Sequence, residues 1–360
     1  GQFITLIPFS WRLGPKYTKS KMEIYRYQGM NSFDQRRYVF DRICSIVNYA
    51  YQHNNFYREF YRQRGFTPGQ LREFDDIKKI PVVTKALLRQ FSLEERSTPQ
   101  VGRILVNTGG TSGEPLHFYL ERNSFAREWG HMHYIWSKLG YNQRCRKLTF
   151  RGKNLGELPL KYNPVNNEYL VNAYRGLSEV VEALSLVLNR SKISFLHGYP
   201  SLIYDFARFC QEKAPFMVEQ LSSSLRGIFL ASEYPAPVYR DLIESVFMVP
   251  TISWYGHSEA AVLAYEASAK YRYEPLMTYG YAEAVKDEEG RYHLVGTSYH
   301  NMVSPFIRYD TGDIIVPKWD DQILGSFTIS EGRVGEFIID KSGKRISLTA
   351  LIFGRHHKVF

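Results

Sequence analysis

Apolar residues in the first part of the chain recur at the spacing of an amphipathic helix. Val39, Ile43, Ile46, Val47 and Ala50 fall on one face of such a helix. Neighbouring arginines form a basic outer face, which we interpret as a solvated surface because no DNA- or RNA-binding motif accompanies it. The pattern therefore predicts that residues 1–99 form a helical region packed on a larger domain.

Between residues 100 and 270 the pattern changes to short apolar runs that alternate with helical segments. The runs predict strands at 103–106, 147–150, 193–196, 227–230 and 251–254. Helical spacing predicts helices capped by Asn123 and Ser178, a helix opened by Pro200, and one over 237–247. This alternation is typical of an α/β core in which helices flank a parallel or mixed sheet.

The helical spacing ends near Tyr271, and short strand-like runs follow. They cover 279–284, 292–296, 313–316 and 326–329. Consecutive short strands without helices between them are typical of antiparallel sheets. We expect residues 271–332 to form a small antiparallel, barrel-like region.

The composition is that of a folded globular protein. The chain has 360 residues, 44% hydrophobic and 23% charged, so it is long enough to bury a large core and disorder is not indicated. Cys44, Cys145 and Cys210 are odd in number and far apart, which argues against a disulfide framework or a structural zinc site. We therefore expect a protein of the reducing cytoplasm.

The net charge of +10 favours acidic partners such as nucleotides, polyanionic saccharides, nucleic acid or anionic lipid. A solvated basic surface without a partner is the alternative. No apolar run is long enough to span a membrane, and residues 1–14 are too short and interrupted for a signal peptide. This opening segment could lie on a membrane surface, so the inner face of the membrane is a second candidate location. We expect no nucleic-acid partner.

A loop rich in glycine and hydroxyl residues lies between the apolar run at 104–106 and a second extended run at 116–120. It contains Thr108, Gly109, Gly110, Thr111, Ser112 and Gly113. Glycines let the backbone approach a ligand closely, and successive N–H groups with hydroxyls can converge on an anion. The loop is not a Walker loop, since it lacks the lysine and the following helix. Either a phosphate-binding loop or an ordinary hairpin turn fits this segment.

Three further blocks follow predicted strands, where open α/β sheets bind ligands. In residues 254–259, Tyr255 could stack on a base, Gly256 permits close approach, and Glu259 could hold a magnesium ion. In residues 308–313, Asp313 could accept both hydroxyls of a ribose. Arg333 lies between glycines in residues 332–336. Taken singly, each residue has an ordinary structural explanation: Tyr255 as a core aromatic, Asp313 as a turn residue and Glu259 as a surface carboxylate.

In this order and at these separations, the four blocks resemble the adenylate-forming superfamily of acyl and aryl ligases. The resemblance is closest to the phenylacetate-CoA ligase branch and its CapK-like proteins of capsule and O-antigen biosynthesis. Residues 55–58, 80–85 and 198–201 also look like that branch. The resemblance implies the large N-terminal domain of these enzymes, with helix-flanked mixed sheets and a small antiparallel barrel-like region.

The resemblance also implies a mechanism and roles for individual residues. A carboxylate attacks the α-phosphorus of ATP, pyrophosphate leaves, and a thiol, amine or hydroxyl then captures the acyl-adenylate. Such chemistry depends on positioning and on charge neutralisation. The implied roles are phosphate binding for Thr108, Thr111, Ser112 and Gly113 with Gly109 and Gly110, adenine contact for Tyr255, Gly256 and Glu233, magnesium binding for Glu259, ribose binding for Asp313, and a hinge near the α-phosphate for Arg333.

Relatives carry a further domain of about a hundred residues after the hinge arginine, a usual size for a small domain. Only residues 335–360 follow it here, so we expect residues 333–360 to be the hinge and the start of a largely absent C-terminal domain. The leading hypothesis is an ATP-dependent, AMP-forming carboxylate ligase of surface-polysaccharide assembly. It would use ATP and Mg²⁺, act on a small carboxylate, and transfer the acyl group to CoA, a sugar or an amine.

Two alternatives stay open. The chain could be a homologue that binds nucleotide without catalysis, which is favoured by the missing domain and by Glu114 where many relatives have a lysine. It could also be a basic protein that binds polyanions or a membrane surface, with the four blocks as ordinary turns. Binding to any polyanion with a steep salt dependence would favour the second alternative.

Overall fold

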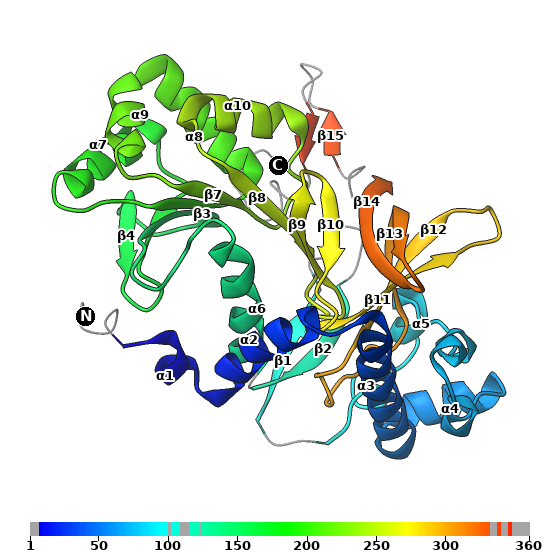
Figure 1. Cartoon of the computed structure of the whole chain (residues 1–360). Helices are drawn as coiled ribbons and strands as arrows, with labels where there is room; N and C mark the ends of the chain where they lie inside the picture. The colour runs from blue at the N-terminus through cyan, green and yellow to red at the C-terminus, as the bar shows by residue number, and fades with distance from the viewer. Residues whose placement is uncertain are drawn as a thin grey trace. The chain divides into compact units, whose positions relative to one another are not determined.

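The computed structural model describes residues 7–99, 102–108, 115–122 and 124–331, and two strands at 337–339 and 345–347. Two compact units divide the chain (Figure 1). The antiparallel unit comprises Gly14–His131 and Tyr255–Gly335. The parallel unit comprises Gly1–Leu13, Met132–Trp254 and Glu336–Phe360. Both units are therefore discontinuous in sequence.

The parallel unit is built on a sheet with the strand order β8-β7-β6-β3-β5-β4. All neighbours in it are parallel except β4 and β5. Helices follow or connect most of these strands, as parallel pairing requires. The elements are α1 (Phe9–Leu13), β3 (Lys147–Lys153), β4 (Leu160–Asn163), β5 (Glu168–Asn172), α7 (Leu177–Leu188), β6 (Phe195–Gly198), α8 (Pro200–Lys213), α9 (Pro215–Ser222), β7 (Gly227–Leu230), α10 (Pro237–Phe247), β8 (Thr251–Gly256), β15 (Phe337–Ile339) and β16 (Arg345–Ser347).

Both faces of this sheet are covered. All four residues of β6 and of β7 are buried, as expected for parallel strands. Helices α7 to α10 lie on one face (Figure 1), where Leu196 and Ile228 join their apolar side chains in one core. On the other face Trp136, from the last turn of α6, stacks on Phe229 with ring centroids 5.0 Å apart. The predicted helix-flanked sheet is thus confirmed.

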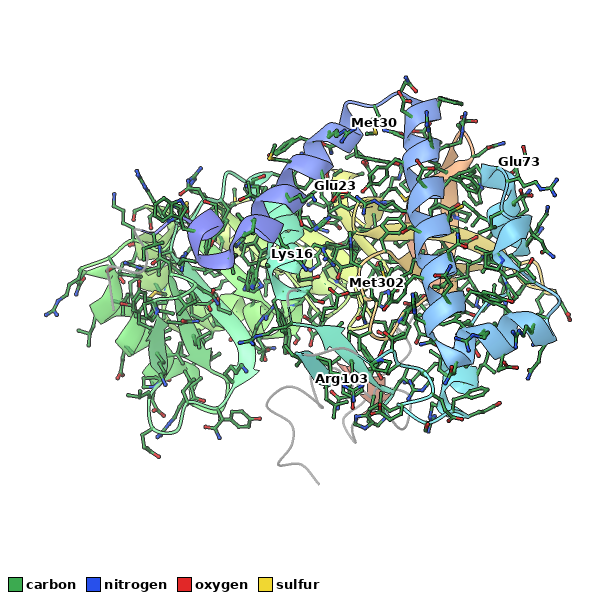
Figure 2. All side chains as sticks on the ribbon, turned by 90° about the horizontal axis from the view of Figure 1, so that it is seen from below. Lys16, Glu23, Met30, Glu73, Arg103 and Met302 are labelled. Atoms are coloured by element: carbon green, nitrogen blue, oxygen red, sulfur yellow. The ribbon has the colours of Figure 1, made fainter. Side chains whose placement is uncertain are left out.

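Helices form the first part of the antiparallel unit. They are α2 (Pro15–Gln28), α3 (Ser32–His53), α4 (Asn55–Gln63), α5 (Lys85–Arg89), the 3-10 turns η2 (Pro68–Gln70) and η3 (Phe74–Lys79), and α6 (Ser124–Ser137), which runs on into the other unit. The predicted apolar face of α3 is buried throughout. Figure 2 shows α2 beside α3, and Glu23 of α2 accepts a hydrogen bond from Tyr38 of α3 at 2.7 Å and pairs with Arg42.

The sheet of the antiparallel unit has the strand order β11-β12-β13-β14-β10-β9, with every neighbouring pair antiparallel. Its strands are β9 (Leu263–Ala269), β10 (Arg272–Pro275), β11 (Gly280–Lys286), β12 (Tyr292–Ser298), β13 (Tyr309–Asp320) and β14 (Ile323–Glu331). The four strands predicted beyond Tyr271 are therefore confirmed, although β13 and β14 are longer than predicted. A separate hairpin is formed by β1 (Arg103–Asn107) and β2 (His117–Glu121).

Some predicted boundaries are wrong. Helix α7 begins at Leu177 with Gly176 at its N-cap, so Ser178 lies within the first turn rather than at the cap. Strand β6 begins two residues later than predicted. Strands β4, β5, β9 and β10 were not predicted, because each carries polar residues that interrupt its apolar run. Among the helices that the structure describes, none is long and apolar enough to cross a membrane.

Candidate functional site

The glycine-rich loop connects the two strands of the β1–β2 hairpin. Thr108 closes it at the base: its backbone N–H donates to Leu116 O, and its Oγ1 accepts from Leu116 N–H, both at 3.0 Å. Thr108 is buried, so its hydroxyl fixes the ends of the loop. Gly109, Gly110, Thr111, Ser112 and Gly113 lie outside the described residues, and their phosphate-binding role stays a prediction.

Two predicted nucleotide residues of the antiparallel unit meet directly. Tyr255 lies near the end of β8, just after Trp254, where the chain passes from the parallel to the antiparallel unit. Its Oη donates a hydrogen bond to Asp313 Oδ2 on β13 at 2.5 Å. The Tyr255 ring also meets Phe327 of β14 edge to face, with centroids 5.6 Å apart. The hydrogen bond and the ring contact hold the tyrosine in one orientation beside the carboxylate. The structure thus brings together the predicted adenine and ribose contacts.

Asp313 is presented by a bulge in β13. Val295 pairs with Asp310 and His293 with Ile314, so three residues of β13 lie opposite Leu294 alone. The backbone angle φ of Gly312 is +80°, a left-handed conformation that favours glycine. The Gly312 N–H donates a hydrogen bond to Asp310 Oδ1 at 2.8 Å. Bulges of this kind redirect a side chain. Asp313 therefore follows an irregularity inside a strand.

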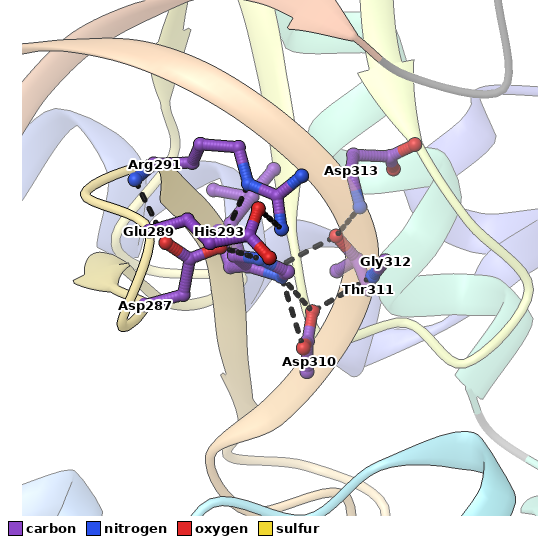
Figure 3. A network of polar contacts seen from close by, with 9 residues as sticks. Asp287, Glu289, Arg291, His293, Asp310, Thr311, Gly312 and Asp313 are labelled. Carbon is purple, nitrogen blue, oxygen red and sulfur yellow. Dashed lines mark hydrogen bonds and ion pairs between the residues drawn. The ribbon is translucent and has the colours of Figure 1, made fainter.

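A polar network stabilises this bulge from the β11–β12 side (Figure 3). His293 contacts Asp310 Oδ2 through Nδ1 and Asp287 Oδ2 through Nε2, each at 3.1 Å. Arg291 Nε donates to Asp287 Oδ2 at 2.9 Å and its Nη2 contacts Glu289 at 2.7 Å. Burial raises the pKa of Asp287, but hydrogen bonds from Arg291 and His293 outweigh it and lower the pKa to about 2. The sequence did not point to His293, because its partners are distant or lie across a turn.

Glu259 is buried and both of its oxygens accept hydrogen bonds. His257 Nδ1 contacts Oε2 at 3.0 Å, and Tyr309 Oη donates to Oε1 at 2.9 Å. Val262 N–H donates to His257 Nε2 at 3.1 Å, so the ring proton is on Nδ1, facing the carboxylate. Burial raises the pKa of Glu259, yet the hydrogen bonds from His257 and Tyr309 prevail and bring it to about 2. Glu259 is an ionised carboxylate at neutral pH.

The donor chemistry of Glu259 suits magnesium, which binds one or two carboxylates and completes its shell with water and substrate phosphates. Among the described residues there is no group of three or more histidine, cysteine, aspartate or glutamate side chains that could hold a metal. Water and nucleotide phosphates would therefore have to supply most of the ligands. The magnesium role of Glu259 stays a proposal.

Glu233 belongs to the parallel unit, where it stabilises the start of α8. Its Oε2 accepts from Ser201 N–H and its Oε1 from Ser201 Oγ, both at 3.1 Å. Burial raises the pKa of this carboxyl. The structure gives Glu233 a local capping role, and its adenine contact stays a prediction. Gly256 is exposed at the end of β8, and Arg333 lies outside the described residues.

A pocket of 510 Å³ lies within the antiparallel unit. It adjoins two of the predicted blocks, since Asn107 directly precedes Thr108 and His257 belongs to the block that ends at Glu259. Apolar and polar side chains both face it. The lining residues are Leu105, Val106, Asn107, Leu120, Ser124, Phe125, Arg127, Glu128, His257, Ser258, Ala260, Tyr279, Ser298, His300 and Asn301.

Hydrogen bonds fix several of the polar side chains that line this pocket or adjoin it. Tyr279 Oη donates to Glu128 Oε2 at 2.5 Å, and burial raises the pKa of both groups. His300 Nε2 donates to Thr278 O at 3.1 Å. Next to them, buried His131 contacts Arg127 O and Thr278 Oγ1, and burial lowers its pKa to about 4. His131 is therefore a structural histidine.

Sequence reasoning missed Glu128, Tyr279 and His300. One signal was present: Glu128 lies in the apolar helical pattern of α6, next to Trp129. A carboxylate in such a pattern is buried with a partner more often than it is left without one. The identity of that partner, 151 positions away, could not be read from the pattern.

Comparison of the sequence with known proteins gives one curated relative, and no family model matches the chain. The relative is protein CapK of Staphylococcus aureus, 24% identical over 309 residues, which are 83% of this chain and 67% of CapK. The predicted similarity to CapK is confirmed.

Solved structures of two kinds of ligase share the fold. 2-Hydroxyisobutyryl-CoA ligase, in an open conformation with 2-HIB-AMP and CoA, is 18% identical with a TM-score of 0.65, covering 89% of this chain and 80% of its own. The same ligase in the postadenylation state gives a TM-score of 0.67 at 18% identity, and the match covers 89% of this chain and 72% of the ligase chain. GH3.15 acyl acid amido synthetase is 13% identical with a TM-score of 0.54, and the match covers 88% of this chain and 71% of the synthetase chain. The chain therefore has the fold of adenylate-forming ligases, as predicted, whereas the phenylacetate-CoA ligase branch remains a prediction.

Proposed function

We propose that the protein is an ATP-dependent, AMP-forming carboxylate ligase. The observation that carries this proposal is the Tyr255–Asp313 pair, held by a bulge and a hydrogen bond in the same unit as a 510 Å³ pocket. A substrate carboxylate oxygen attacks the α-phosphorus of ATP while the bond from that phosphorus to the pyrophosphate oxygen breaks. An acceptor thiol, amine or hydroxyl then attacks the acyl carbon and loses its proton, while the bond from that carbon to the phosphate oxygen breaks and AMP leaves.

Each predicted residue has a physical task in this scheme. The carboxylate of Asp313 accepts hydrogen bonds from ribose hydroxyls, and the ring of Tyr255 packs on adenine. Thr108 sets the ends of the loop whose Thr111, Ser112 and glycines bind phosphate oxygens through N–H and hydroxyl groups. Glu259 would hold a magnesium ion, which would neutralise phosphate charge, and Arg333 would contact the α-phosphate region. Positioning and charge stabilisation supply the catalysis.

The acceptor and the biological setting belong to the same proposal. The fold neighbours are, by name, a CoA ligase and an acid amido synthetase, so a thiol such as CoA and an amine are both candidate acceptors. The similarity to CapK supports a role in capsule polysaccharide assembly, with a sugar amine or hydroxyl as a further acceptor. We place the enzyme in the cytoplasm, where ATP is available.

The first test is calorimetric titration of magnesium-ATP, and separately of AMP, into the protein and its Asp313→Ala variant. The variant loses hydrogen bonds to the charged Asp313 carboxylate, so the binding free energy of both nucleotides should weaken by about 1.5 to 3 kcal/mol. Tyr255→Phe keeps the ring and removes only the bond to Asp313, so a smaller loss is expected. Asp241→Ala on exposed α10 is the matched control and should bind as the parent does.

Nucleotide binding alone does not establish a ligase, so exchange of labelled pyrophosphate into ATP is measured with a panel of carboxylic acids. Exchange that depends on one acid supports acyl-adenylate formation. Saturable binding without exchange for any acid would favour the nucleotide-binding homologue. Absence of binding at millimolar nucleotide would overturn the proposal.

A further inference from the structure

The carboxylate of Asp310 lies where the β13 bulge meets the polar network of the β11–β12 side (Figure 3). Its Oδ1 accepts the N–H of Gly312 at 2.8 Å, and its Oδ2 lies 3.1 Å from Nδ1 of His293. Gly312 directly precedes Asp313 and has the left-handed φ of +80°. The side chain of Asp310 therefore connects His293 to the backbone that presents Asp313.

We propose that His293 is a positioning residue for nucleotide binding, and that it acts through Asp310 and Gly312 on the carboxylate of Asp313. This inference rests on the proposed function, because it takes Asp313 as the contact to the ribose. It goes further by giving a role to a residue that lies outside the four sequence blocks.

His293 is fixed at both ring nitrogens. Its Nε2 lies 3.1 Å from Asp287 Oδ2. Asp287 is fixed in turn, since its Oδ1 accepts the backbone N–H of Arg291 at 2.8 Å and its Oδ2 accepts from Arg291 Nε at 2.9 Å. A doubly protonated ring donates to both carboxylates at once, whereas a neutral ring donates through one nitrogen only. The ring thus joins the β11–β12 turn to β13.

The bulge depends on side chains to fix its backbone, because a bulge interrupts the regular ladder of its strand. Two contacts replace the ladder here: Gly312 N–H with Asp310 Oδ1, and Asp313 N–H with Thr311 Oγ1 at 3.3 Å. The Asp310 contact is the shorter one. With Oδ2 bonded to His293, Asp310 cannot rotate freely, so Oδ1 stays directed at Gly312.

Two conservative variants separate the two contacts of the ring. The amide nitrogen of asparagine lies close to the position of Nδ1, and that of glutamine lies close to the position of Nε2. His293→Asn should therefore keep the contact to Asp310, and His293→Gln should keep only the contact to Asp287. If His293 acts through Asp310, the asparagine variant binds nucleotide more tightly than the glutamine variant. Since 25% of the side chain is exposed, neither variant creates a buried cavity.

The test is calorimetric titration of the whole chain with magnesium-ATP and with magnesium 2′,3′-dideoxy-ATP, which lacks both ribose hydroxyls. His293→Gln should weaken ATP binding about 5-fold, the scale of one hydrogen bond, and His293→Asn less than about 2-fold. Neither variant should change the binding of dideoxy-ATP. In the Asp313→Ala background His293→Gln should have no further effect, because both residues act on one contact.

His53→Gln, at an exposed position of α3, is the matched control and should bind ATP as the parent does. Equal losses of ATP and dideoxy-ATP binding in His293→Gln would indicate a general structural role and overturn the inference. So would a loss that adds fully to that of Asp313→Ala, or an asparagine variant that binds ATP no better than the glutamine variant.

Exchange of the Gly312 amide, measured by NMR without nucleotide, distinguishes failure of this inference from failure of the proposed function. It should be faster in His293→Gln than in the parent chain and in His293→Asn. Unchanged exchange would overturn the inference whether or not nucleotide binds. Faster exchange in a chain that binds no ATP would reject the ligase and with it the nucleotide role of His293. ATP binding that responds to Asp313→Ala but not to His293→Gln would reject only the inference.

Discussion

Some buried polar side chains differ between the two units in how completely their hydrogen-bonding atoms are paired. In the antiparallel unit Arg308 forms two bonds to Glu283, at 2.8 and 2.9 Å, and His131 is bonded through both ring nitrogens. In the described part of the parallel unit, buried Lys147 bonds only to neutral oxygens, and neither nitrogen of His197 has a hydrogen-bond partner. Arg308 and His131 thus belong to completed polar networks, although Tyr299 Oη and Asn301 Oδ1 of the same unit lack a hydrogen-bond partner. Such networks fix side chains in place, which a catalytic site requires.

The largest expected effect comes from breaking the buried ion pair. Arg308→Met should lower the free energy of unfolding by about 3 to 5 kcal/mol, because it leaves Glu283 buried without its partner. It also removes bonds to the backbone oxygens of Lys78 and Ile80. Denaturant unfolding measures the change.

Lys147→Met is the counterpart in the parallel unit. Burial lowers the pKa of Lys147 to about 8, which shows that the charged form is penalised there. Glu168 loses a nearby positive charge but keeps its hydrogen bonds from Thr149, Asn163 and Asn166, so the change in unfolding free energy should stay within about 1 kcal/mol or be stabilising. Equal losses in the two variants would contradict the comparison.

An intermediate effect is expected from acid. Burial lowers the pKa of His131 from 6.5 to about 4, so the unfolded chain binds more protons than the folded one between these values. Stability is therefore lost as the pH falls from 6.5 towards 4, by about 3 kcal/mol for this histidine. His131→Gln should flatten this part of the stability profile, whereas exposed His53→Gln should not. A steep acid slope in both variants would assign the loss to other groups.

The smallest effect concerns His197. Its ring lies against Trp136 at 5.0 Å and Trp254 at 6.1 Å, without a hydrogen bond at either nitrogen. His197→Phe keeps the ring contacts and removes two desolvated nitrogens, so it should raise the free energy of unfolding by about 1 kcal/mol. Thermal unfolding at pH 7 measures it. A clear loss of stability would show that the imidazole has a favourable role that the contacts do not reveal.

Local periodicity alone determined much of the fold. The helix over 237–247 and the buried face of α3 follow the apolar spacing because each helix buries one side against a core. The strand over 227–230 is a continuous apolar run because both of its faces are buried. The two strands around the glycine-rich loop were predicted from their short extended apolar runs. The short strands β4, β5, β9 and β10 were missed, since pairing with neighbours, rather than their own sequence, makes them strands.

The candidate site divides in the same way. The sequence named Tyr255, Glu259 and Asp313, because residue types at strand ends indicate ligand chemistry. Only the tertiary structure joined Tyr255 to Asp313 across 58 positions and placed Glu259 between His257 and Tyr309. It alone revealed the pocket that Glu128 and His300 line. Side-chain contacts and burial set these pKa values and orientations, and both depend on residues that are far apart in the chain.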